Sequence, residues 1–164
     1  MNNAANPMRT SAADEQAGDI LACMHEAVIM ADLKGIILVW NQGAEDVFGF
    51  TAAEAIGQSV DLVIPEKMRA AHWEGFNKAV EHGDTLSVRG ARMTRALKKN
   101  GEPLYVDMSF AMVHDQAGAL TGSIAVARDA TARFMAERAA RQQAASGRTP
   151  DPTGDNAVTL PHSS

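Results

Sequence analysis

Cysteine is nearly absent from this chain, because Cys23 is the one thiol among 164 residues. A disulfide within the chain and a metal site built from several thiolates are therefore excluded. The chain also lacks a run of about 18 apolar residues, the minimum for a helix that spans a membrane. Residues 1–18 are polar and acidic, without the charged-then-apolar order of a secretory signal. We expect a cytoplasmic protein that does not contact a membrane.

Positive charge is not in excess, since the formal net charge at pH 7 is -5. A chain of this charge has no broad attraction to phosphate backbones or anionic lipids, so nucleic acid is not an expected partner. The hydrophobic share of 46% and the charged share of 21% are those of a soluble globular protein. The length accommodates one domain with tails.

Catalytic motifs are missing as well. The sequence has no Gly-x-Ser-x-Gly elbow, no phosphate-binding glycine loop ending in Lys-Ser/Thr, and no Gly-x-Gly-x-x-Gly after a strand. His25 and Glu26 begin like a zinc-protease motif, but Ile29 occupies the position of the second histidine. We expect no enzymatic activity.

Composition divides the chain into four parts. Residues 1–13 and 146–164 are rich in small and polar side chains with little to bury, which predicts disordered tails. Between them, residues 14–133 are expected to form one domain that begins with a flanking helix. Residues 134–145 combine Ala, Arg, Glu and Gln, which favours a C-terminal exit helix.

The first half of the domain predicts a hairpin followed by short helices. Residues 27–31 and 36–40 are rich in β-branched and aliphatic side chains, with a turn between them. Asn41 is a helix cap, and Thr51 opens a further helix with Glu54 in capping-box spacing. Two strands therefore precede the inner helices.

The second half predicts three more strands. Residues 104–112 alternate between apolar and polar side chains, which is the period of a strand with one buried face. An Asn-Gly pair at 100–101 favours a tight hairpin with residues 86–97, and residues 120–128 form the third strand. The fold class is therefore α+β, with a five-stranded antiparallel sheet, short helices packed on one face, and flanking N- and C-terminal helices.

A longer helix is predicted from Pro65 to Gly83, because proline is tolerated in a first helical turn and glycine ends helices. At about 100° per residue, one arc of this helix is mostly apolar and the opposite arc is charged. The mostly apolar arc contains Met68, Arg69, His72, Trp73, Phe76, Ala79 and Val80. His72 is therefore expected to face the interior.

This order of elements resembles the PAS fold. Six short motifs carry the resemblance: Asn41, Ala44-Glu45-x-x-Phe48-Gly49-Phe50, Glu54-x-x-Gly57, Ile64-Pro65, Lys98-Lys99-Asn100-Gly101 and Arg128-Asp129-Ala130-Thr131. Together they are similar to the S-box pattern of PAS sensor proteins, over about residues 17–133. The resemblance implies a signal-sensing domain.

Haem b is the cofactor that this resemblance implies. Residues 64–72 (Ile-Pro-Glu-Lys-Met-Arg-Ala-Ala-His) resemble the iron-ligating helix of FixL-type and Dos-type oxygen-sensing PAS domains, with His72 as the metal ligand. Arg92 lies where the FixL type has the arginine that hydrogen-bonds bound oxygen. A neutral imidazole is a sound axial ligand for iron, and a cation opposite it stabilises a partly negative oxygen. Oxygen or another diatomic gas, or a change of redox state, is the implied signal.

Further residues are expected to contact the haem. The apolar wall is expected to come from four strand residues: Met108, Phe110, Ile124 and Val126. Met68 and Phe76 belong to the apolar arc of the helix, and Arg69 in the same arc either accepts a haem propionate or extends its guanidinium to solvent. Gly75 leaves room beside His72 for a flat macrocycle.

Other interpretations remain open from the sequence. A histidine on an apolar helix face is also typical of a core residue hydrogen-bonded to a neighbour, and Arg92 is also typical of a surface strand. The alternative function is a haem-free PAS interaction module with an empty or metabolite-binding cavity. Flavin photochemistry is not expected, because the Asn-Cys-Arg-Phe stretch of flavin-binding members is missing.

The output is expected to pass to another chain, since a kinase core or a cyclase does not fit into the residues after 133. A separate kinase or regulator is the expected partner of this stand-alone domain. Ile20, Leu21 and Met24 form an apolar stripe. That stripe either pairs with a second copy in a homodimer or packs back on its own sheet.

Overall fold

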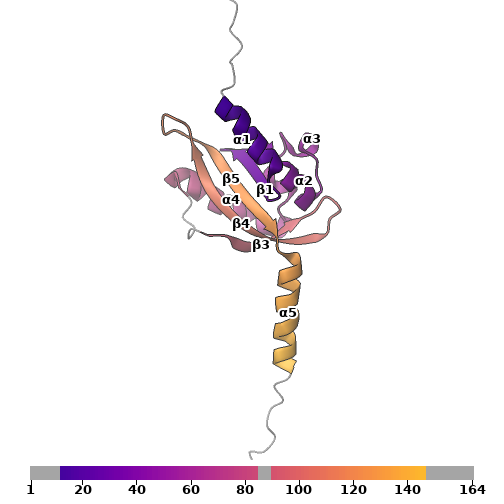
Figure 1. The fold of residues 1–164 in the computed structure, drawn as a ribbon. Coiled ribbons are helices and arrows are strands. Elements are labelled where there is room, and N and C mark those ends of the chain that lie inside the picture. The colour runs from indigo at the N-terminus through magenta and orange to yellow at the C-terminus, as the bar shows by residue number, and fades with distance from the viewer. Residues whose placement is uncertain (1–11, 85–89, 147–164) are drawn as a thin grey trace, which may run out of the picture. The chain divides into compact units, whose positions relative to one another are not determined.

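A computed structural model describes residues 12–84 and 90–146, and it contains one five-stranded antiparallel sheet with helices around it (Figure 1). The N-terminal half contains α1 (Ala12–Cys23), β1 (Ala27–Asp32), β2 (Ile37–Trp40), α2 (Gln42–Phe48), α3 (Ala52–Ala55), the 3-10 helix η1 (Val60–Leu62) and α4 (Glu66–His82). The C-terminal half contains β3 (Arg92–Leu97), β4 (Pro103–His114), β5 (Leu120–Asp129) and α5 (Thr131–Ser146). The predicted α+β fold class is confirmed.

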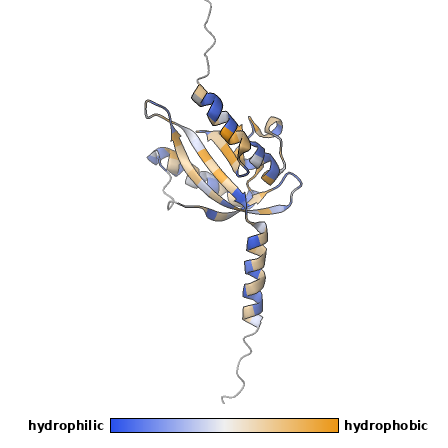
Figure 2. Cartoon of the chain, in the orientation of Figure 1, coloured by the Kyte–Doolittle hydropathy of each residue, from blue (hydrophilic) through white to orange (hydrophobic). Residues whose placement is uncertain are grey.

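The strand order in the sheet is β2-β1-β5-β4-β3. The last strand therefore pairs with the first, with Ala27 opposite Ala127, and all neighbouring strands are antiparallel. This pairing brings the two ends of the domain together at the centre of the sheet. The central strands are largely apolar, whereas α5 mixes polar and apolar residues along its length (Figure 2).

The short helices pack on one face of the sheet, as predicted. Phe48 of α2 is fully buried against core residues of the strands, among them Ile37 and Leu104. Its ring centroid lies 5.4 Å from that of Trp40. Val63, which follows η1, accepts a hydrogen bond from the backbone N–H of Leu97 at 2.9 Å. These contacts attach the helical segment to both edges of the sheet.

The helix ends follow the predicted caps. Asn41 caps α2, and Gly49 ends it in the left-handed conformation with φ +83°. Thr51 and Glu54 form the capping box of α3. In α4, Pro65 is the N-cap and Gly83 the C-cap. Local capping chemistry therefore defines where these helices begin and end.

The register of β5 corrects one part of the predicted site. Met108 lies opposite Ala127 and Phe110 lies opposite Ala125, so these pairs share one side of the sheet. Because successive strand residues point to opposite sides, Ile124 and Val126 point to the other side. The prediction that these two residues form a wall with Met108 and Phe110 is wrong. Residues 124–127 are apolar throughout, so the sequence shows no alternation that would reveal which of them face the core.

α5 belongs to a separate compact unit, Ala132–Ser164, of which the structure describes residues 132–146. Glu137 lies 3.8 Å from Arg133 and 3.2 Å from Arg141, both in i,i+4 spacing. The predicted tails fall largely on residues 1–11 and 147–164, outside the described residues, as do residues 86–89 of the predicted strand 86–97.

Candidate functional site

His72 lies on the inner arc of α4, as predicted. Its Nε2 atom is buried and has no hydrogen-bond partner among the described residues. The imidazole stacks on Phe76, with ring centroids 6.2 Å apart and an angle of 23° between the planes. Trp73 meets the imidazole edge to face at 5.4 Å. The ring is therefore held in a largely aromatic environment.

Burial lowers the pKa of His72 below its usual 6.5, and the nearby Asp61 carboxylate offsets part of this effect. The ring is therefore neutral at pH 7, and a neutral imidazole is the form that ligates a metal. A buried polar atom without a partner requires an explanation, since most such atoms are hydrogen-bonded. A ligand that accepts a nitrogen lone pair supplies one.

Arg69 fastens η1 to α4. Its Nε donates to the carbonyl of Ile64 at 3.2 Å, and its Nη2 donates to the carbonyl of Asp61 at 3.1 Å. Nε also lies 3.9 Å from the Asp61 carboxylate. The geometry gives Arg69 a structural role, and its pairing with a haem propionate stays a prediction.

Trp73 attaches α4 both to η1 and to the turn between β1 and β2. Its Nε1 donates to the Asp61 carboxylate at 3.0 Å. Its ring packs on Gly35, where an added Cβ would lie 2.2 Å from the ring. Sequence reasoning identified Gly35 only as a turn residue and did not identify Asp61, because both contacts join segments far apart in the chain. These contacts set the position of the helix that carries His72.

Among the described residues, the core side of the sheet is less covered at Phe110 than at Met108. Met108 is 8% exposed, whereas Phe110, two residues along β4 on the same side, is 46% exposed. Met68 on α4 is 36% exposed. Arg92 lies opposite Met108, so it shares this side of the sheet, and it is exposed. Figure 1 shows α4 behind the sheet. Large apolar side chains on a core side that stay exposed indicate room for an additional apolar group.

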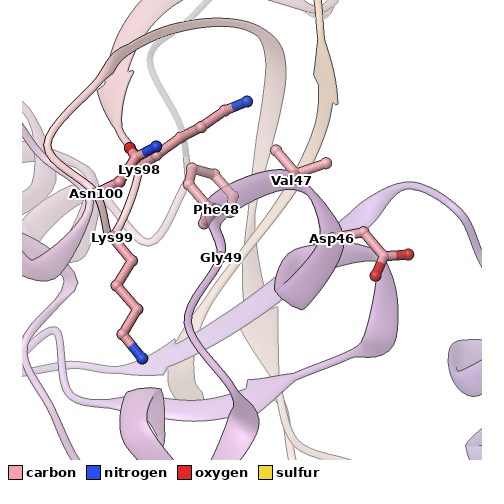
Figure 3. Close-up of a pocket in the computed structure, with 7 residues that line it drawn as sticks. All are labelled: Asp46, Val47, Phe48, Gly49, Lys98, Lys99 and Asn100. Atoms are coloured by element: carbon pink, nitrogen blue, oxygen red, sulfur yellow. The ribbon is translucent and has the colours of Figure 1, made fainter.

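A separate hollow of 420 Å³ lies between the end of α2 and the turn that joins β3 to β4 (Figure 3). Its lining residues are Asp46, Val47, Phe48, Gly49, Lys98, Lys99 and Asn100. Lys98 lies 3.8 Å from Asp129, and Lys99 lies 2.5 Å from Glu54. Both lysines are therefore paired with carboxylates, and this hollow contains none of the predicted site residues.

The residues present fit a haem better than a metal ion held by side chains. Within residues 12–84 and 90–146, no group of three or more His, Cys, Asp or Glu side chains is placed to hold a metal ion. A haem iron needs only an axial protein ligand, because the macrocycle supplies the equatorial nitrogens.

In the same described part of the chain, no helix has the length and apolar character required to cross a membrane.

Comparison with known families identifies the domain. The family model described as the PAS fold matches residues 18–130. This chain belongs to the PAS family. PAS domains are generally sensory modules rather than enzymes, and they commonly dimerise and relay signals to kinases.

Curated relatives are sensor proteins and a kinase. Sensor protein FixL of Bradyrhizobium diazoefficiens is 29% identical over 90 residues, covering 55% of this chain and 18% of that protein. Oxygen sensor protein DosP of Escherichia coli is 27% identical over 106 residues, covering 65% and 13%. Sporulation kinase C of Bacillus subtilis is 27% identical over 124 residues, covering 75% and 28%. The chain thus spans less than a third of each of these relatives.

Solved structures show the same fold. A PAS domain from Colwellia psychrerythraea has a TM-score of 0.61 at 23% identity, covering 70% of this chain and 94% of that chain. An RNA-binding light-oxygen-voltage receptor has a TM-score of 0.66 at 18% identity, covering 90% and 41%. At these identities the likeness shows the fold, and the ligand has to be inferred from the residues of the site.

Proposed function

We propose that this PAS domain binds haem b through His72 and senses a diatomic gas, with oxygen as the first candidate. The observation that carries the proposal is the buried, unpartnered Nε2 of a neutral imidazole. The relatives named as an oxygen sensor and as sensor protein FixL support it.

Haem would supply a redox-active iron with a position for a gas ligand. His72 would hold the haem iron through its imidazole nitrogen. The apolar contacts would come from Met68 and Phe76 on α4 and from Met108 and Phe110 on β4. Arg92 shares the core side of the sheet with Met108, and its guanidinium is suited to stabilise negative charge on a polar ligand. Ile124 and Val126 are not included, because they point to the other side.

Hemin titration with two histidine variants tests this proposal. Purified protein titrated with hemin is expected to develop a sharp Soret band that saturates with one haem per chain. His72→Ala should remove or shift that band, because the axial nitrogen is lost.

His82→Ala is the matched control. His82 lies on the same helix, is exposed and contacts the carbonyl of Lys78 at 2.6 Å, so its loss should leave the Soret band unchanged. A wild-type protein that does not titrate, or a His72→Ala spectrum identical to wild type, would refute the haem proposal.

The alternative is a haem-free interaction module with an empty or metabolite-binding cavity. Two observations favour it: the ring of Phe76 stacks on His72, and the side chain of Arg92 is exposed. A colourless protein that stays a folded dimer would support this second function. In either case, we propose that the chain acts as a homodimer and relays its state to a separate kinase or regulator.

A further inference from the structure

Within residues 12–84 and 90–146, helix α1 lies mainly along the surface of the domain. Its main neighbour is α2, and most of its described residues are exposed. Ile20 exposes 62% of its surface, whereas Leu21 and Met24 are half-buried. The last turn of α1 also has no basic side chain to satisfy its free carbonyls. A side chain from elsewhere in the chain that bonds to these carbonyls would fix this end of the helix.

Asn41 supplies that partner. It is a buried polar residue, 8% exposed, and both ends of its amide are engaged. Oδ1 accepts from the backbone N–H of Val28 at 2.8 Å and of Ala44 at 2.9 Å. Nδ2 donates to the carbonyl of Leu21 at 3.0 Å and to that of Glu26 at 3.0 Å, with Met24 further away at 3.5 Å. The side-chain oxygen thus bonds to β1 and α2, and the side-chain nitrogen bonds to α1 and the segment that follows it.

The position of Asn41 connects this amide to the core. Trp40 precedes it and packs on Phe48, which is fully buried near the end of α2. The backbone of α2 also lies against the segment after α1, because a Cβ on Gly43 would be 2.2 Å from the carbonyl of Glu26. A displacement of this core packing would therefore move Asn41 directly.

The segment after α1 has its own attachments. The carboxylate of Glu26 lies 2.6 Å from Nη2 of Arg128 on β5. From Ala27 onward, β1 is paired with β2 on one side and with β5 on the other. Loss of the Nδ2 bonds would therefore leave β1 in place and release α1.

We propose that Asn41 is a latch that holds α1 on the domain and couples it to the core. α1 opens and closes as a local unit, and the Nδ2 donor of Asn41 sets the balance between the two states. Release of α1 would expose the half-buried side chains of Leu21 and Met24. This inference does not require haem.

Two substitutions of Asn41 would remove the Nδ2 donor while keeping an oxygen acceptor. Asn41→Asp keeps an oxygen for Val28 and Ala44 but replaces the donor by a second acceptor that faces carbonyls. Asn41→Ser is the milder variant, since serine also caps helices but cannot replace the Nδ2 donor. Gln42→Ala is the matched control, because Gln42 is the adjacent residue, is exposed, and donates from Nε2 to the Asp46 carboxylate at 3.0 Å rather than to α1.

Amide hydrogen exchange measured by mass spectrometry on the full chain is the test. In both Asn41 variants, α1 amides should exchange faster by on the order of tenfold, which corresponds to the loss of about one net hydrogen bond. Amides of β4 and β5 should keep their protection, and the Gln42→Ala protein should match wild type.

Three outcomes would overturn the proposal. The first is unchanged α1 protection in both variants. The second is a loss of α1 protection that only parallels the loss in the sheet. The third is failure of both variants to fold, because the amide would then serve the whole domain rather than hold α1.

Discussion

At the scale of single residues, Asn41 and His72 differ in how their polar atoms are hydrogen-bonded. The amide of Asn41 is hydrogen-bonded through both its oxygen and its nitrogen, as expected of a buried polar group that orders its surroundings. The Nε2 of His72 is buried without a described partner. A satisfied amide holds segments together, whereas an unsatisfied imidazole is a candidate ligand.

Glu54 provides a prediction on acid stability. The hydrogen bond from Lys99, followed by that from the backbone N–H of Thr51, lowers the pKa of Glu54 from 4.5 to about 2. Because the pKa is lower in the folded state, the carboxylate stabilises the fold above pH 4.5, and this contribution is lost as the pH falls from 4.5 towards 2. Glu54→Gln should flatten the dependence of unfolding free energy on pH in that window.

Carboxyl titration by NMR would measure the pKa of Glu54 directly, and urea unfolding at several pH values would measure the stability difference. Glu66→Gln is a suitable control, because Glu66 is exposed in the first turn of α4. Parallel stability curves for wild type and Glu54→Gln between the two pKa values would contradict the prediction.

At the scale of elements, α4 and β5 differ in how far their sequences define them. The inner arc of α4 follows from its period, and the structure places His72 and Ala79 on that arc as expected. The orientation of β5 does not follow from its sequence, because a continuous apolar run has no visible alternation. Helix period is thus the stronger guide to side-chain direction here.

Gly75 gives a prediction for α4. It lies within the helix, is exposed, and an added Cβ would have nothing within 4 Å. Because glycine in a helix costs roughly 0.5–1 kcal/mol relative to alanine, Gly75→Ala should raise the unfolding free energy by about that amount. Urea unfolding of the haem-free protein would measure the gain.

Gly57→Ala is the matched control for this change. It has the same open space around the added Cβ, but its φ of +85° is unfavourable for alanine, so the same substitution should destabilise the protein. A loss of stability for Gly75→Ala would show that the space beside α4 is needed by the fold.

At the scale of the whole molecule, we predict that two copies of the chain associate through α1. Ile20 on α1 is the large apolar residue with the highest exposed fraction in the described part of the chain, at 62%. Such a side chain is suited to pair with the same surface of a second copy. Ile20→Glu should therefore shift the protein from dimer towards monomer, as measured by sedimentation equilibrium.

Ile56→Glu serves as the control, because Ile56 is 48% exposed but lies at the end of α3 rather than on α1. It should leave the dimer intact. A wild-type protein that sediments as a monomer, or a dimer that Ile20→Glu does not weaken, would contradict the proposed pairing through α1.

Local rules let the sequence determine the helices, the strands, their caps, the PAS assignment and the inward direction of His72. Period, capping and turn chemistry act within a few residues, so they can be recognised without coordinates. The tertiary structure decided the side of β5 that faces the core, the bonds of Arg69 to the η1 region, the contact of Trp73 with Gly35, and the Nδ2 partners of Asn41. Each of these depends on how separate segments pack against one another, and in Asn41 the same amide that caps its own helix also bonds to a residue twenty positions earlier in the chain.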